Sequence, residues 1–168
     1  HYRDARVLHR YEGTTAIQGN DLVCRKTLRD GGAAVRSVIA GIRRDRDGIA
    51  AGGNGVGATA SAMRAACDTA EAALDTLLAR ANSPRDAAAS GADFLMMLGY
   101  LSGGWQLARG AAAAARSAAS GEGDPEFMAA KQATAGAYMA HSLPEVSKMA
   151  AKISGGPDAL SAINPDWL

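Results

Sequence analysis

The chain has 168 residues, which is enough for one domain of ordinary size and too few for two. Its 18 Lys and Arg nearly balance its 17 Asp and Glu, so it lacks the basic excess of a protein that binds nucleic acid over most of its surface. Its 39 alanines, together with only 5% aromatic residues, predict an all-α fold, because alanine is the strongest helix former.

The N-terminal region has no apolar stretch typical of a signal peptide, since charged residues begin at Arg3. The first residue is His1 rather than Met, so we expect a piece of a longer polypeptide. The most apolar stretch, 94–101, is too short to span a bilayer. Cys24 and Cys67 form no CxxC motif, and we expect two buried thiols in a reducing compartment rather than a disulfide or a metal site. These features predict a cytoplasmic protein without a membrane span or a metal.

Two helices are predicted before residue 50. The first follows the N-cap candidates Thr14 and Thr15 and covers 16–28, although its apolar residues fit one helical face only loosely. Asp30-Gly31-Gly32 is a typical helix end. The second helix covers 34–46, with apolar residues at helical spacing. Alternating charges over Arg43–Asp47 predict a solvated helix end rather than a basic patch.

Three longer helices are expected after a glycine-rich loop at 50–57. They cover 59–80, 84–119 and 126–153. Ser83 and Asp124 are N-cap candidates, and each precedes a proline at the first helical position. Gly103-Gly104 is expected either to kink its helix or to let a neighbouring helix approach closely. Pro144 is expected to kink the last helix near His141.

The helices predict an antiparallel bundle of four or five helices. Met96 and Met97 beside Phe94 are interpreted as a core stripe rather than a ligand pocket, and His141 as a packed or capping residue. We expect Trp167 and Leu168 to anchor the tail. The large core residues expected in the three long helices are Leu74, Leu77, Leu98, Leu101, Trp105 and Tyr138.

The segment 3–31 carries the most specific motif. It reads Arg-Asp-Ala-Arg-Val from Arg3, then Tyr-Glu-Gly-Thr over 11–14, and then Ile17-Gln18. This segment strongly resembles the flavin-dependent acyl-CoA dehydrogenases, which show an Arg-Asp-Ala-Arg/Lys-Ile helix end, a Tyr-Glu-Gly-Thr turn and an Ile-Gln at the start of the closing helix. Without this context, Glu12 would be interpreted as a solvated loop carboxylate.

The resemblance implies that Glu12 is the catalytic base, which removes a proton from the carbon next to a thioester. This chemistry needs a rigidly held base and hydrogen-bond donors on the thioester oxygen. The resemblance implies that the backbone N–H of Glu12 is one of those donors. It also implies that Tyr11 and Gly13 are substrate-binding residues, with a core tyrosine and an ordinary turn glycine as the alternatives.

Thr14, Thr15 and Gln18 resemble positions that contact the adenosine-diphosphate end of FAD, the cofactor that accepts the hydride. A helix N-terminus suits an anion, and helix capping explains the threonines equally well. The resemblance implies an acyl-CoA thioester as substrate, electron-transfer flavoprotein as electron acceptor, and a homo-oligomer. The family's N-terminal helical domain and middle β-domain match nothing here, so we expect the chain alone to be inactive and to bind no FAD.

We divide the chain into 1–31, the end of the family's C-terminal helical domain, and 32–168, a helical extension. The stretch around Gly103-Gly104-Trp105 and the Leu143-Pro144 ending resemble the extension of one branch. That branch includes the 3-methylmercaptopropionyl-CoA dehydrogenases. We expect the extension to serve assembly.

Two alternative functions remain open. The Ala- and Gly-rich helices also suit a non-catalytic oligomerisation module. The alkylation-response flavoproteins form another branch of the family, whose extension is linked to DNA binding. Residues 49–168 hold eight basic and eleven acidic side chains, a net charge of −3, which argues against contacts with DNA phosphates. Residues 1–48 carry +4, from ten basic and six acidic side chains.

Overall fold

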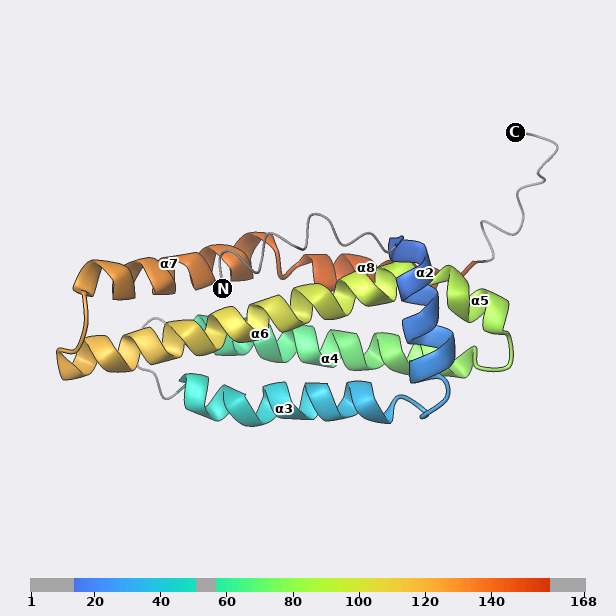
Figure 1. The fold of residues 1–168 in the computed structure, drawn as a ribbon, viewed down its shortest axis with the longest axis horizontal. Coiled ribbons are helices and arrows are strands. Elements are labelled where there is room, and N and C mark those ends of the chain that lie inside the picture. Colours follow the sequence, from blue (N-terminus) through green and yellow to red (C-terminus); the bar gives the residue numbers. More distant parts are fainter. Residues whose placement is uncertain (1–13, 51–56, 158–168) are drawn as a thin grey trace, which may run out of the picture.

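The computed structural model describes residues 14–50 and 57–157, and helices make up most of this part of the chain (Figure 1). The described residues contain no strand, which confirms the predicted all-α fold. Residues 51–56 of the glycine-rich loop predicted at 50–57, and the tail anchor at Trp167 and Leu168, lie outside the described residues.

The long helices form an antiparallel bundle (Figure 1). Three of its sides are each formed by one helix, namely α3 (Ala33–Ala50), α4 (Gly57–Ala79) and α6 (Gly91–Ser120). α7 (Pro125–His141) and α8 (Glu145–Gly155) lie end to end and together form one further side of the bundle. The predicted antiparallel bundle is therefore confirmed, with α6 contacting all of the other long helices.

Two short elements lie at one end of the bundle. α2 (Thr15–Asn20) continues directly into a π-helix, η2 (Asp21–Thr27), and together they cross that end of the long helices (Figure 1). The wider π turn changes which positions face inward, so that Val23 and Thr27 are buried. This irregular turn explains why the apolar residues predicted over 16–28 fit one α-helical face poorly.

The helix predicted over 84–119 is divided in two. α5 (Pro84–Ala89) ends at Ser90, and α6 begins at Gly91. Ser83 is the N-cap residue of α5 and Pro84 its first residue, as predicted, although the Ser83 hydroxyl donates to Asp86 instead of capping the backbone. The prediction of one continuous helix is wrong because α2 packs against the chain where the two helices meet.

The Gly103-Gly104 pair does not break α6, which continues through it. An added Cβ at Gly103 would lie 2.6 Å from the Tyr138 hydroxyl, and one at Gly104 would lie 3.0 Å from both Leu143 and Met63. The glycines therefore admit neighbouring side chains closely, which is the second of the two predicted possibilities. Tyr138 uses this space to donate a hydrogen bond of 3.0 Å to the carbonyl of Tyr100.

The kink predicted near His141 is a complete break between α7 and α8. α7 ends at His141, and the backbone N–H groups of Ser142 and Leu143 both donate to the Tyr138 carbonyl at 2.9 Å. Pro144 then precedes the first residue of α8. His141 is exposed in the last turn of α7, which excludes the packed alternative of the prediction and leaves the capping one.

The buried core confirms half of the predicted large residues. Leu74, Leu77 and Leu101 are fully buried, whereas Leu98, Trp105 and Tyr138 are only partly buried against the core. Both ring side chains have a polar end that bonds at the edge of the bundle, which keeps the rings partly exposed. Of the predicted methionine stripe, Phe94 and Met97 are buried, and Met96 is 41% exposed.

Candidate functional site

The predicted catalytic and substrate-binding residues Tyr11, Glu12 and Gly13 lie outside the described residues. The predicted cofactor-binding residues follow directly after them. Thr14 precedes α2, and Thr15 and Gln18 lie in its first turns. All three are exposed, so this end of α2 presents two hydroxyl groups and one amide at the surface.

The start of α2 distinguishes the two interpretations of Thr14. Its backbone is extended, with φ −61° and ψ 131°, and its carbonyl accepts a hydrogen bond of 3.1 Å from the backbone N–H of Gln18. Its side chain makes no capping hydrogen bond. Capping therefore does not explain the hydroxyl of Thr14.

A backbone-to-backbone contact holds α2 against α6. A Cβ added to Gly19 would lie 2.4 Å from the carbonyl carbon of Gly91, and one added to Gly91 would lie 2.8 Å from the carbonyl carbon of Gly19. Both positions are buried. Because no side chain separates the two helices here, the position of α2 is set by the position of α6.

An ion pair on the exposed side of η2 supports the same segment. Arg25 donates two hydrogen bonds to Asp21, and Lys26 lies 3.5 Å from the same carboxylate. The hydrogen bond from Arg25 is the largest cause of the lowered pKa of Asp21. This pair is exposed and local, so we assign it a structural role.

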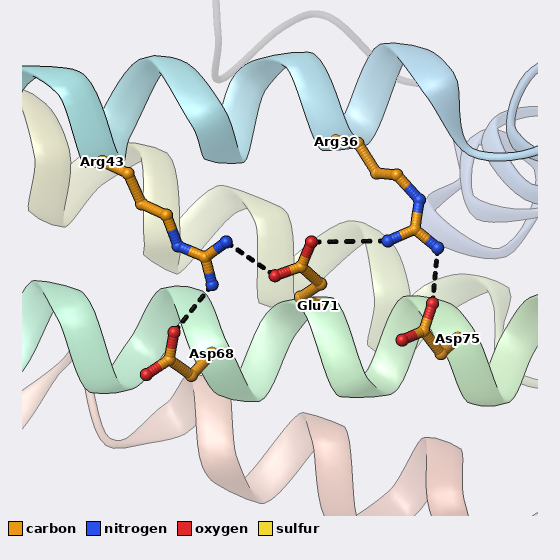
Figure 2. A network of polar contacts seen from close by, with 5 residues as sticks. All are labelled: Arg36, Arg43, Asp68, Glu71 and Asp75. Atoms are coloured by element: carbon orange, nitrogen blue, oxygen red, sulfur yellow. Dashed lines mark hydrogen bonds and ion pairs between the residues drawn. The ribbon is translucent and has the colours of Figure 1, made fainter.

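Two arginines on α3 and three carboxylates on α4 form a continuous network (Figure 2). Glu71 lies between the two arginines, 2.7 Å from Arg43 and 3.4 Å from Arg36. Arg43 also bonds Asp68 at 2.7 Å, and Arg36 bonds Asp75. Hydrogen bonds to these carboxylates raise the pKa of both arginines. The network joins α3 to α4, and its charged groups pair with one another.

A second polar cluster joins α3 to α6. The indole N–H of Trp105 donates to Asp45 at 3.0 Å, and Arg109 lies 3.3 Å from the same oxygen. The Arg109 guanidinium also lies over the Trp105 ring, 5.6 Å from its centroid. Arg43 and Asp45 of the predicted solvated helix end therefore make tertiary contacts, whereas Arg44 is exposed as predicted.

An open groove of about 610 Å³ lies beside this cluster, between α3 and α6. The groove was not predicted from the sequence. The signal for it in the sequence is the spacing of Arg109 and Arg116, which lie seven residues apart and so on one helix face. The residues that line the groove are Arg44, Asp45, Gly48, Ile49, Gln106, Arg109, Gly110, Ala112, Ala113 and Arg116.

The two cysteines differ in burial, and Cys67 does not have the features of a reactive thiol. Cys67 is buried, and burial raises its pKa to about 11, so it stays protonated at neutral pH. Cys24 is only partly buried, which differs from the prediction, and its thiol lies 3.8 Å from the Pro84 carbonyl. Both thiols are free.

Residues 14–50 and 57–157 contain neither a metal site of acidic, His or Cys side chains nor a membrane-spanning helix. No group of three or more His, Cys, Asp or Glu side chains in these ranges could hold a metal ion. None of the helices in this part of the chain is both long enough and apolar enough to span a membrane.

Comparison with known proteins gives two matches. Residues 32–164 match the family described as acetyl-CoA dehydrogenase C-terminal like. The 3-methylmercaptopropionyl-CoA dehydrogenase of Ruegeria pomeroyi is 43% identical over 160 residues, which cover 95% of this chain and 27% of that protein. The chain therefore spans about a quarter of the length of the curated relative it matches.

Proposed function

This chain belongs to the acetyl-CoA dehydrogenase C-terminal-like family, and we propose that it is the C-terminal part of a flavin-dependent acyl-CoA dehydrogenase. The proposed reaction removes two hydrogens from an acyl-CoA thioester and forms an α,β double bond. One observation carries the proposal, namely the 43% identity to a dehydrogenase that acts on a CoA thioester. A homo-oligomer, electron-transfer flavoprotein as acceptor and a cytoplasmic location belong to the same proposal.

The match to that relative extends into the proposed catalytic turn. It covers 95% of the chain, so about eight residues at most lie outside it. Residues 11–18 therefore fall within the matched part wherever the uncovered residues lie. This coverage supports the assignment of the turn and the bundle to one protein type.

Glu12 is the proposed catalytic base. Its carboxylate takes the proton from the carbon next to the thioester carbonyl, and its backbone N–H donates to the thioester oxygen, where negative charge develops. Gly13 leaves room for the substrate, and Tyr11 lines the acyl pocket. The rigid attachment of α2 through Gly19 and Gly91 supports this role, because a base must be held in place to act on a weak acid.

FAD is the cofactor implied by this function, and when bound it accepts the hydride from the β-carbon. The donors exposed at the start of α2 suit it, because hydroxyl and amide groups donate hydrogen bonds to phosphate oxygens. We assign Thr14, Thr15 and Gln18 to its adenosine-diphosphate end. They can contact only a small part of so large a cofactor, so the remaining contacts come from outside this chain.

Substitution of the base tests the proposal. In the full-length protein, Glu12→Gln keeps the size of the side chain and removes its basicity. We expect bound flavin to remain while its reduction by acyl-CoA slows about 10²–10⁴-fold or more in stopped-flow absorbance. Glu122→Gln, in the exposed turn after α6, is the matched control. Reduction of the Glu12→Gln flavin at the unmodified rate would assign the base to another residue.

The bundle is proposed to serve assembly as well. Ile17, Val38, Met96 and Phe127 are large apolar residues that stay at least 41% exposed. Contiguous exposed apolar patches are typical of surfaces that meet another subunit, so each of these residues is a position at which to test for an interface. We expect Phe127→Ser to weaken self-association in sedimentation velocity without changing the helical content. An unchanged distribution of species would exclude α7 from the subunit interface.

A further inference from the structure

We propose that the groove between α3 and α6 binds the phosphate groups of a ligand of nucleotide size. Its volume of about 610 Å³ lies within the usual range of small-molecule sites. This site is formed by the ends of α3 and α6 that lie away from α2 and η2 (Figure 1). The proposal is independent of the catalytic role assigned to Glu12.

The charge of the groove favours an anion. Three arginines line it, Arg44 from α3 and Arg109 and Arg116 from α6. Arg109 and Arg116 are two helical turns apart, about 10 Å along the axis, which suits a ligand with more than one anionic group. Among the described side chains, Asp45 is the one carboxylate that lines the groove, and its charge is compensated by Arg109 at 3.3 Å and by the Trp105 indole N–H at 3.0 Å.

Arg109 is held in a defined orientation before any ligand binds. Its Nε faces Asp45, its Nη1 donates to Gln106 at 3.2 Å, and its plane lies over Trp105. A guanidinium fixed in this way loses little conformational entropy when its remaining N–H groups meet a phosphate. Arginine recognises phosphate oxygens through paired, charge-assisted hydrogen bonds, which supports phosphate as the anionic group.

Two glycines that line the groove leave space for the ligand. Gly48 on α3 and Gly110 on α6 line it, and an added Cβ at either position would meet no atom within 4 Å. Helix-interior glycines destabilise a helix by about 0.5–1 kcal/mol relative to alanine, and packing does not require these two. The two glycines therefore leave open space beside the three arginines, and a bound ligand could occupy it.

Two variants test the groove in the 168-residue chain, with circular dichroism to verify folding. The double substitution Arg44→Gln and Arg116→Gln removes two cations. We expect calorimetry at low salt to show ADP or coenzyme A binding at least about tenfold more weakly than in the unmodified chain. Arg64→Gln combined with Arg85→Gln is the matched control, because it removes the same charge from exposed positions on α4 and α5. We expect it to change the affinity less than twofold.

Gly110→Leu fills the groove and leaves every charge in place. We expect it to abolish binding without loss of fold, since there is space for the new side chain. Pyrophosphate, ADP and coenzyme A are the three probes. The probe that binds with the highest affinity shows whether the groove recognises phosphate alone, a nucleotide or coenzyme A. Each of these results supports recognition of phosphate groups.

Three results would overturn the proposal. The first is no binding of any probe at millimolar concentration. The second is equal weakening by the groove pair and the control pair, which would mean that binding depends on net charge alone. The third is a short DNA duplex binding more tightly than the three probes and losing affinity in the groove variants, which would assign the arginines to a nucleic acid.

Discussion

α4 and α7 are both long helices rich in alanine, but they relate to the core in opposite ways. α4 buries nine of its 23 residues, including Met63, Leu74 and Leu77, and it contacts α3, α6, α7 and α8. α7 buries only Ala135 among its 17 residues. The difference shows that similar composition gives a central helix or a peripheral one according to where the few large side chains lie.

The peripheral helix is defined by local signals. Asp124 accepts a hydrogen bond of 3.0 Å from the backbone N–H of Glu126, and Pro125 occupies the first helical position. It packs closely along α6, and Tyr138 reaches the Tyr100 carbonyl across Gly103. α7 therefore depends on capping and on close packing of small residues along α6, whereas α4 depends on the burial of large side chains.

The largest expected effect tests this contrast directly. Leu74→Ala in α4 removes a fully buried side chain, and we expect the free energy of unfolding to fall by about 2–5 kcal/mol in urea titrations. Phe127→Ala in α7 removes a larger side chain that is 53% exposed and contacts Lys131 through its ring. We expect this second change to cost less than about 1 kcal/mol. Equal losses would show that α7 contributes to the core as much as α4 does.

Two glycine substitutions are expected to give the next largest changes in stability. Gly19→Ala places a Cβ 2.4 Å from the backbone of Gly91, so α2 must move away from α6. We expect a loss of about 1–3 kcal/mol. Gly136→Ala in α7 meets no atom within 4 Å, and we expect it to stabilise the protein by about 0.5–1 kcal/mol. Thermal melts of the two variants should therefore shift in opposite directions.

Opposite shifts would confirm that α2 is held by contact and that α7 has free space. A stabilised Gly19→Ala variant would mean that the two helices do not touch in solution. The catalytic assignment would then lose one support, because the turn that carries Glu12 directly precedes α2.

The sequence predicts helices well here because their ends carry local signals. Asp124-Pro125 and Ser83-Pro84 mark helix starts at the observed positions. The break at Ser90 was not predictable in this way, because it depends on contact with Gly19, about 70 residues earlier. The π-helix η2 gave only an indirect signal, in the poor fit of its apolar residues to one helical face.

The candidate functional residues also include some that the sequence predicts and others that it does not. The family motif names Glu12 and Thr14 from neighbouring residues alone, and a motif of that kind requires no knowledge of the fold. The groove between α3 and α6 combines residues about 60 positions apart, such as Asp45 and Trp105. No local pattern joins them, because their proximity is created by helix packing.

The smallest expected change in stability concerns the network of arginines and carboxylates between α3 and α4. Glu71 bonds both Arg36 and Arg43, so Glu71→Gln weakens two links between α3 and α4 (Figure 2). The arginines are about 40% exposed, and solvent screens such pairs, so we expect a loss of at most about 1 kcal/mol in low salt. The difference from the unmodified chain should shrink further in 1 M NaCl, where the screening length is about 3 Å.

Urea titrations at both salt concentrations measure this difference, and Glu122→Gln in the exposed turn controls for the general effect of one lost charge. The control is needed because salt also changes the stability of the unmodified chain. If Glu71→Gln cost as much as Leu74→Ala and the loss persisted in high salt, the arginine network would hold α3 to α4. The contrast between α4 and α7 would then be one of charge pairing, and burial would no longer explain why α4 is the central helix.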